Sequence, residues 1–370
     1  NNNNNNNNNG KREKYELKEE MNINITTKVR IIGICIETRP DAINNEWITF
    51  FRNSGTTRIQ IGVQHNNDLI LKKINRGHTF KDSCDAIENL KNNGFKIDIH
   101  LMPDLPYSNY ELDKEMIDII FKTSVLCPDQ IKIYPCQITP YTVIKKWYEE
   151  GKYVPYSETN PGQLVKLIKY SFEICPPWIR FPRVVRDIPL PLIVGGNKVT
   201  NLRQVIDNEL KKSNTKIMEI RSREIGRNLD YLKKWKWLKI RKYKSNNTSE
   251  YFISIESWDG NALYGFLRLR IPPPIYKYEP VFNILKNKGL VRELHVYNTL
   301  VPVGKNKNNS SQHQGIGKKL LFISEIISFL HNLNGVSVIS GEGVRNYYKK
   351  QGYKNIDTYM IKNFKIKFNS

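Results

Sequence analysis

Strand-like and helix-like segments alternate along the first half of the chain, and this alternation constrains the fold more than any other feature. Four apolar, β-branched runs predict strands: "VRIIGICI" from Val29, "TRIQIGVQ" from Thr57, "FKIDIHLM" from Phe95 and "DQIKIYP" from Asp129. Helical patterns such as "KDSCDAIENLKNNG" and "ELDKEMIDIIFKTS" lie between them, and Gly94 is a typical helix stop. Strands that alternate with helices imply crossover connections and a parallel sheet or barrel. We therefore expect an α/β fold over residues 30–212.

Polar residues follow each predicted strand. In parallel α/β folds, functional groups gather at the carboxyl ends of the strands. The groups in this position are Glu37–Asp41, Gln64–His65, His100–Asp104 and Tyr134–Pro135. The first of them, "ETRPD", has two interpretations, which both stay open: it lines a ligand site, or Glu37 and Arg39 form a salt bridge at the rim.

The order of elements changes at about residue 250. "YFISIESWDGNALYGFLRLRIP" predicts a hairpin that turns at Asp259-Gly260, and "LVRELHVYN" predicts a third strand. A glycine-rich turn then opens a long helix, and the strand "VSVIS", the short helix "VRNYYKKQG" and the last strand "YKNIDTYMIKNF" follow. We expect an α+β domain over residues 250–370. Residues 213–249 are interpreted as a basic, partly helical connector, and the Asn-rich, charged residues 1–29 as disordered.

The chain is strongly basic. It has 58 Lys and Arg against 36 Asp and Glu, a net charge of +22, and such an excess attracts polyanions such as nucleic acids. A general richness in Lys, Asn and Ile explains the charge equally well. The run Lys233–Lys244, with Trp235 and Trp237, is either a surface that binds phosphates and stacks bases or a solvated face. No membrane span or leader is recognised, so we expect a cytoplasmic or nuclear protein.

The cysteines do not predict a metal site. Cys35, Cys84, Cys127, Cys136 and Cys175 include no closely spaced pair, which argues against a disulfide framework and a zinc knuckle. The stretch from Lys216 to Ser222 contains neither Cys nor His. We predict no metal ligands in the chain.

The glycine-rich turn predicts an anion site. Its glycines leave backbone N–H groups bare at the start of a helix, where the helix dipole favours negative charge, although a plain turn is an alternative interpretation. The order of turn, helix, strand and Tyr-Tyr resembles the GNAT acetyltransferase fold. The resemblance implies that the pyrophosphate of coenzyme A is bound by Gln314, Gly315, Ile316, Gly317 and Lys318. It implies that the pantetheine arm pairs with Glu293, Leu294, His295 and Val296. It also places Tyr348, and with it Tyr347, as catalytic residues near the thioester, unless they are packing aromatics.

A wider resemblance covers residues 30 to about 362. The motifs "IETRPD", "INRGHT", "HLMPDLP", "KIYP", "RDIPLPLI", "IRSREIG" and "GVRNYYKKQGY", in this order, resemble the family of the Elongator catalytic subunit. The resemblance implies a radical S-adenosylmethionine (β/α) barrel followed by a GNAT-like acetyltransferase domain. It implies acetyl-CoA, S-adenosylmethionine and a [4Fe–4S] cluster as cofactors. It also implies tRNA and other Elongator subunits as partners, and modification of the wobble uridine at C5. Glu37–Asp41 would line the mouth of the barrel.

One departure from the family affects this expectation. The family binds its cluster through three cysteines on a loop that would precede residue 30, and none of the five cysteines here matches them. We therefore expect an incomplete barrel, in a fragment of a longer protein or in a protein without radical chemistry. Two alternatives remain: a protein lysine N-acetyltransferase with Glu293 or His295 as general base, and a truncated, inactive tRNA-binding scaffold.

Overall fold

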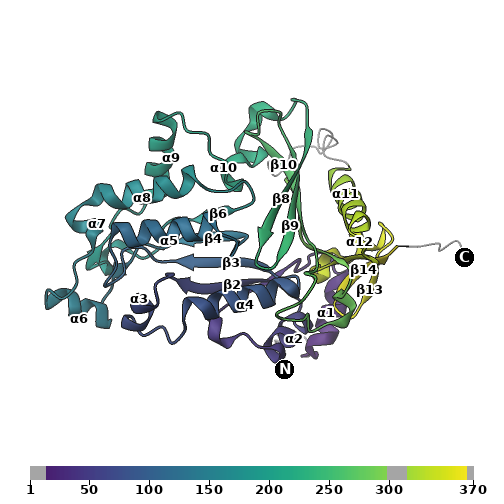
Figure 1. The fold of residues 1–370 in the computed structure, drawn as a ribbon, viewed down its shortest axis with the longest axis horizontal. Coiled ribbons are helices and arrows are strands. Elements are labelled where there is room, and N and C mark those ends of the chain that lie inside the picture. The colour runs from purple at the N-terminus through teal and green to yellow at the C-terminus, as the bar shows by residue number, and fades with distance from the viewer. Residues whose placement is uncertain (1–13, 298–314, 365–370) are drawn as a thin grey trace, which may run out of the picture.

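The computed structural model describes residues 14–297 and 315–364 and contains two main β-sheets (Figure 1). The first sheet has five parallel strands in the order β1-β2-β3-β4-β6. Its strands are β1 (Ile34–Thr38), β2 (Thr56–Gln64), β3 (Lys96–Leu101), β4 (Gln130–Ile133) and β6 (Arg180–Arg183). The short strands β5 (Gln137–Ile138) and β7 (Gly195–Gly196) pair separately. The predicted α/β fold with a parallel sheet is confirmed.

Helices connect and cover the parallel strands. They are α1 (Leu17–Thr26), α2 (Asn45–Asn53), α3 (Asp68–Lys73), α4 (Phe80–Asn92), α5 (Tyr110–Lys122), α6 (Val143–Glu149), α7 (Tyr156–Thr159), α8 (Pro161–Glu173), α9 (Leu202–Lys212) and α10 (Ile220–Arg223). Fully buried strand residues such as Ile61 and Ile99 share one core with Leu90 of α4 and Met116 of α5. Burial of each such side chain contributes about 1.5–3 kcal/mol, so this core holds the sheet and its helices together.

Local sequence signals determine where α4 begins and ends. Thr79 and Asp82 form a capping box, in which the Asp82 amide donates to Thr79 Oγ1 (3.2 Å) and the Thr79 amide donates to Asp82 Oδ2 (2.7 Å). Gly94 follows the helix with a φ of +90°, which costs a residue with a side chain more than it costs glycine. The predicted helix and its glycine stop are confirmed.

The first predicted strand is shorter than the sequence suggested. β1 begins at Ile34 rather than at Val29, and the preceding Ile31 and Ile32 are exposed. Ile34 is the first residue of β1 with a partner on β2, namely Thr56. The apolar run therefore starts before the sheet does.

The second sheet is mixed and has seven strands in the order β13-β14-β12-β11-β10-β9-β8. They are β8 (Trp237–Ser245), β9 (Thr248–Glu256), β10 (Leu263–Arg270), β11 (Gly289–Val296), β12 (Gly335–Val338), β13 (Lys354–Ile356) and β14 (Tyr359–Asn363). The helices α11 (Ile316–Leu330) and α12 (Arg345–Lys349) accompany it. The predicted hairpin is the antiparallel pair β9–β10.

Two details of the second sheet differ from the sequence prediction. β8 lies in the stretch interpreted as a partly helical connector. It is an edge strand whose side chains are mostly exposed, so its charged residues do not show the pattern of a buried strand. The predicted last strand is two strands, β13 and β14, which are antiparallel and joined by a turn in which Asp357 has a φ of +51°. Both differences add strands to the sheet.

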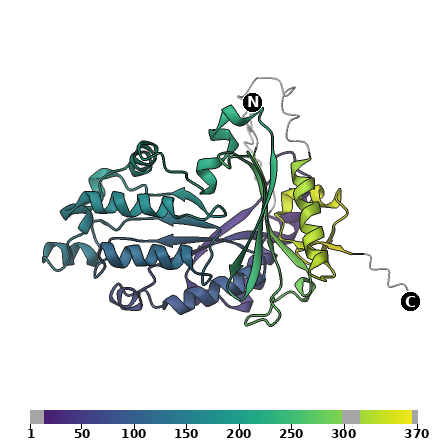
Figure 2. The ribbon, with the colours of Figure 1, turned by 45° about the horizontal axis from the view of Figure 1, so that its top comes forward.

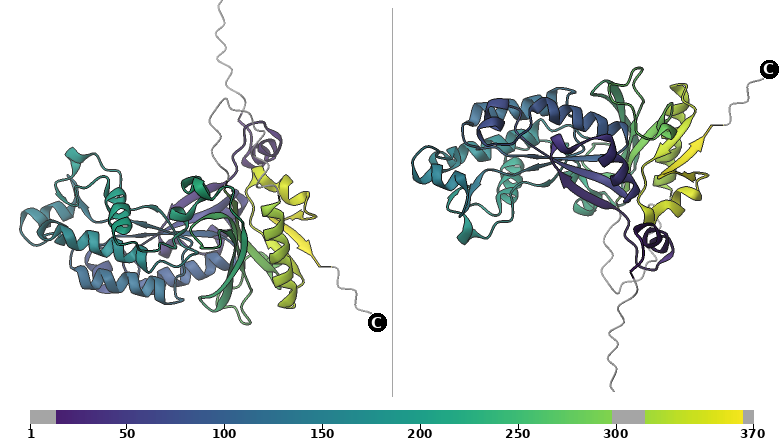
Figure 3. Two further views of the ribbon diagram at one scale, coloured as in Figure 1. Left: turned by 90° about the horizontal axis from the view of Figure 1, so that it is seen from above. Right: turned by 90° about the horizontal axis from the view of Figure 1, so that it is seen from below.

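The second sheet lies across the amino-terminal edge of the parallel sheet, as Figures 1 and 2 show. Lys96, the first residue of β3, pairs with Glu293 of β11 at 2.5 Å. Arg52 of α2 donates to the carbonyl oxygen of Thr358 at 2.5 Å. Figure 3 shows α1 beside the C-terminal elements, where the Ile32 carbonyl lies close to Gly341. The carboxyl ends of the parallel strands therefore point away from the second sheet.

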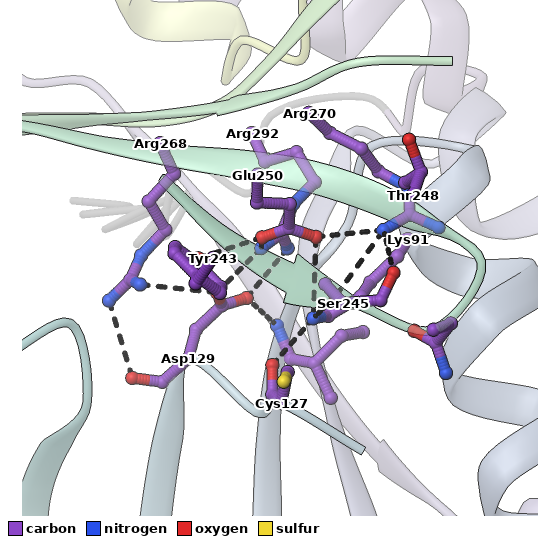
Figure 4. A network of polar contacts seen from close by, with 12 residues as sticks. Lys91, Cys127, Asp129, Tyr243, Ser245, Thr248, Glu250, Arg268, Arg270 and Arg292 are labelled. Carbon is purple, nitrogen blue, oxygen red and sulfur yellow. Dashed lines mark hydrogen bonds and ion pairs between the residues drawn. The ribbon is translucent and has the colours of Figure 1, made fainter. Parts of the chain in front are cut away.

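Buried charges occupy the interface between the two sheets (Figure 4). We call the following residues the interdomain charge cluster: Lys91, Asp129, Glu250, Arg268, Arg270 and Arg292. Each is at most 2% exposed, and residues of α4 and of the loop before β4 meet residues of β9, β10 and β11 here. Buried charges are costly unless they pair, and the pairs of this cluster connect the first half of the chain to the second sheet.

No helix within residues 14–297 and 315–364 combines the length and the apolar character that crossing a bilayer requires.

Candidate active site

A cavity of about 650 Å³ lies where the two sheets meet. Its lining on the first sheet comes from the amino ends of the parallel strands, including Cys35, Arg58 and Lys96. On the second sheet, Leu294 and His295 of β11 line it. The cavity is thus at the amino ends of the parallel strands. The sequence suggested instead that functional groups gather at the opposite edge, at the carboxyl ends.

Strand β11 parts from its neighbour β12 beside this cavity. The parallel pairing of the two strands ends at Val291 and Val338. The next residue, Arg292, is an extra residue in the pairing with β10, since Arg268 faces Glu293 and Leu269 faces Val291. This is a β-bulge, which bends the strand that contains it. Beyond it, the side of β11 that faced β12 has no strand partner among the described residues, so an extended ligand with amide groups could pair there.

The glycine-rich turn lies at the start of α11. Gly315 has a φ of +102° and open space where a side chain would be, and no side chain caps the helix among the described residues. The first amides of α11, those of Ile316, Gly317 and Lys318, therefore have no partner within the helix. Ile316 itself packs into the core with its side chain, and Gln314 lies outside the described residues.

The structure separates the two candidate tyrosines. Tyr348 lines the cavity and is 6% exposed, and burial raises its pKa, so its hydroxyl stays protonated. Tyr347 is more exposed, and its hydroxyl lies over Gly317, where any side chain would collide with it. The catalytic role of either residue stays a prediction, with Tyr348 the better placed.

Glu293 and His295 lie two residues apart on β11 and differ in their capacity to act as a general base. Glu293 pairs with Lys96 (2.5 Å) and Arg268 (2.8 Å). Burial alone would raise its pKa, but these two cations outweigh burial and hold it far below its usual range. Glu293 is therefore too weak a base to accept a proton from an amine. His295 faces the cavity, and desolvation there lowers its pKa, so its imidazole is neutral at pH 7.

Asp98 is buried 3.7 Å from Arg58, which lines the cavity, and its carboxyl group is expected to make the stability of the fold depend on pH. Burial raises its pKa to about 6, although the cations Lys96 and Arg58 act in the opposite direction, and one carboxylate oxygen has no hydrogen-bond partner among the described residues. Between about pH 4 and pH 6 the folded state holds a proton that the unfolded state has lost, so this group destabilises the fold as pH rises. We expect Asp98→Asn to raise the free energy of unfolding by about 3 kcal/mol at pH 7.5. Urea denaturation at both pH values checks this, and equal gains at pH 4 and pH 7.5 would contradict it.

The carboxyl ends of the parallel strands form a second polar region. Arg39 pairs with Asp41 (2.6 Å), and Glu37 lies 3.3 Å from His100. The two residues therefore pair with other side chains, which disfavours the interpretation of a salt bridge between them. Burial lowers the pKa of His100 to about 4. Gln64 Oε1 and both ring nitrogens of His78 are buried there without partners among the described residues. Such orphaned groups fit a polar ligand at this edge.

The cysteines do not fit an iron–sulfur cluster. All five are free: Cys35 lies on β1, Cys84 on α4 and the other three outside helices and strands, whereas a cluster needs thiolates that converge on one point. Burial raises the pKa of Cys84 to about 11 and that of Cys136 to about 12, so both thiols stay protonated. Within residues 14–297 and 315–364, no three His, Cys, Asp or Glu side chains are grouped so as to hold a metal ion.

Comparison with known families assigns a class to this fold. The Radical SAM superfamily profile matches residues 5–118, and the Radical_SAM C-terminal domain profile matches residues 128–212. The first half of the chain therefore has a radical SAM fold, followed by a second domain with a mixed sheet.

The relatives narrow this class to one family. A tRNA uridine(34) acetyltransferase of Dehalococcoides mccartyi is 36% identical over 354 residues, which cover 94% of this chain and 75% of the relative. The human Elongator complex protein 3 is 36% identical, with 91% of this chain and 61% of the relative covered. A solved structure of Methanocaldococcus infernus Elp3 has a TM-score of 0.87 at 36% identity, covering 95% of this chain and 83% of that one. The chain belongs to the family of Elongator complex protein 3 and the tRNA uridine(34) acetyltransferases.

The chain spans less than two thirds of the length of several relatives. The share is 64% for the tRNA uridine(34) acetyltransferase of Methanocaldococcus jannaschii, which is 36% identical over 357 residues.

Proposed function

We propose that this protein is an acyltransferase that binds acetyl-CoA and acts on the wobble uridine of tRNA. The cavity beside the parted strands β11 and β12 carries this proposal, because the free edge of β11 lines it. The uncapped start of α11 adjoins the end of that strand, where Gly317 lies next to Val296. The names of the relatives supply the acceptor, uridine 34 of tRNA. The net charge of +22 favours a polyanionic substrate.

The residues of the site suit acetyl-CoA, which supplies a two-carbon unit as an activated thioester. The free edge of β11 from Glu293 to Val296 would bind the amides of the pantetheine arm. The amides at the start of α11 would bind the pyrophosphate, as helix starts do. The Tyr348 hydroxyl would donate a hydrogen bond to the thioester region. Glu293, fixed by Lys96 and Arg268, holds the strand in place.

The two cofactors of radical chemistry do not fit this chain equally well. The family's S-adenosylmethionine suits the orphaned polar groups at the carboxyl ends of the parallel strands. The cysteines of this chain do not suit a [4Fe–4S] cluster, so we assign no step to one. We further propose a cytoplasmic or nuclear location. Association with other Elongator subunits is proposed from the names of the eukaryotic relatives.

The test is release of coenzyme A from acetyl-CoA, with and without tRNA. We expect acetyl-CoA to bind in calorimetry and its turnover to rise when a transcript with U34 is added. The matched control transcript carries C34 in place of U34. Turnover that depends on a lysine peptide instead would support the second candidate, a protein acetyltransferase in which the neutral His295 is the base. Absence of both binding and turnover would leave an inactive tRNA-binding scaffold.

A further inference from the structure

We propose that Asp129, a residue of the radical SAM half, is a positioning residue for acetyl-CoA because it holds the bulge that frees the edge of β11. This inference rests on the proposed function and deepens it. Asp129 lies in the loop directly before β4, whereas the free edge belongs to the second sheet. The site for the thioester arm is thus completed by the other half of the chain.

The bulge residue is bound firmly by Asp129. Arg292 Nη1 donates to Asp129 Oδ2 and Arg292 Nη2 donates to Asp129 Oδ1, both at 2.7 Å. Arg292 Nη1 also donates to the carbonyl oxygen of Phe95 at 2.9 Å. Arg292 is fully buried, and the two-pronged pairing fixes both the position and the plane of the guanidinium group. These contacts link the extra residue of β11 to the first half of the chain, within the network that Figure 4 shows.

Asp129 is itself anchored in the first sheet. Its Oδ2 accepts a hydrogen bond from the amide of Ile97 on β3 at 2.8 Å. Arg268 of β10 lies 3.4 Å from Oδ1, so the carboxylate faces cations from two strands of the second sheet. Asp129 therefore links β3 to Arg292, the bulge residue of β11.

The position of the bulge gives this contact its consequence for the ligand. Pairing between β11 and β12 ends at Val291, one residue before Arg292, and the cavity opens directly beyond it. A strand without the extra residue would stay straight and could continue along β12, which would close the edge. The pairing of Asp129 with Arg292 stabilises the bulge and so keeps the edge of β11 free.

The experiment measures two ligands on Asp129→Asn. Acetyl-CoA reaches the strand edge, whereas adenosine 3′,5′-bisphosphate carries only the phosphate end, which the start of α11 would bind. We expect the affinity for acetyl-CoA to fall at least tenfold and that for the bisphosphate to change less than twofold. Arg292→Lys keeps the charge but cannot make the two-pronged pair, so we expect the same pattern.

A matched control separates this role from a general loss of stability. Arg52→Gln removes a different buried contact between the two halves, the one to Thr358, which precedes β14 and is separated from β11 by β12. It should leave both affinities unchanged. If Asp129→Asn and Arg292→Lys bind acetyl-CoA as tightly as the wild type does, the inference is overturned but the proposed function is not. The same holds if both variants lose affinity for acetyl-CoA and for the bisphosphate to the same extent. A wild type that does not bind acetyl-CoA would overturn the proposed function and the inference with it.

Discussion

Replacing Glu250 with alanine is expected to lower the free energy of unfolding by about 3–5 kcal/mol. Glu250 is fully buried and accepts hydrogen bonds from Arg292 (2.7 Å), Arg270 (2.9 Å) and Tyr243 (2.9 Å). Burial alone would raise its pKa, but Arg292 and Lys91 outweigh burial and hold it well below its usual range. Without this carboxylate, Arg292 keeps Asp129 as a partner, but Lys91 and Arg270 lose the acidic group with which each forms its ion pair, so the loss is that of uncompensated charge.

Urea denaturation followed by circular dichroism measures this loss. Glu279→Ala is the control, because Glu279 pairs with Lys286 on the surface, where an ion pair contributes about 0–1 kcal/mol. A loss below 1 kcal/mol for Glu250→Ala would show that the interdomain charge cluster contributes little to stability.

Replacing Tyr348 with phenylalanine is expected to slow tRNA-dependent release of coenzyme A about a hundredfold. The ring of Tyr348 packs with Tyr353 and Tyr347, and phenylalanine preserves this packing. The change therefore removes only the hydroxyl in the cavity, which would assist the departing thiolate. We expect the affinity for acetyl-CoA and the melting temperature to stay within experimental error.

Tyr353→Phe is the matched control for this experiment. Its hydroxyl donates to Glu325 at 2.9 Å, away from the residues that line the cavity. It should cost some stability and leave turnover unchanged. Unchanged turnover in Tyr348→Phe would instead identify Tyr348 as a packing residue.

The parallel sheet could be predicted because its strands obey local rules. In β2 and β3 the β-branched residues Ile and Val alternate with polar residues, between clear helix signals, and this alternation is typical of strands. β8 was missed because an edge strand carries its charges on exposed positions, and a run such as "KIRKYK" shows no buried face. Sequence patterns report burial, so they fail where an element is barely buried.

Only part of the candidate site could be predicted from the sequence. The motif near Tyr348 and the stretch Glu293–Val296 could be found by resemblance, and both line or adjoin the cavity. The pairing of Asp129 with Arg292 joins residues 163 positions apart, and no local signal marks it. The cavity at the amino ends of the strands was missed for the same reason, because docking of one sheet on another leaves no periodic pattern.

The shared interior of the two halves restricts how the protein can move. Leu290 and Ile339 of the second half belong to the same apolar core as Ile97 and Phe95 of the first. Domains that close around a ligand by hinge bending need an interface that separates easily, whereas opening this one would hydrate apolar side chains and unpair buried charges together. The cavity therefore cannot widen by a swing of one half away from the other. Entry and exit of a long thioester would therefore depend on local movements at the cavity mouth.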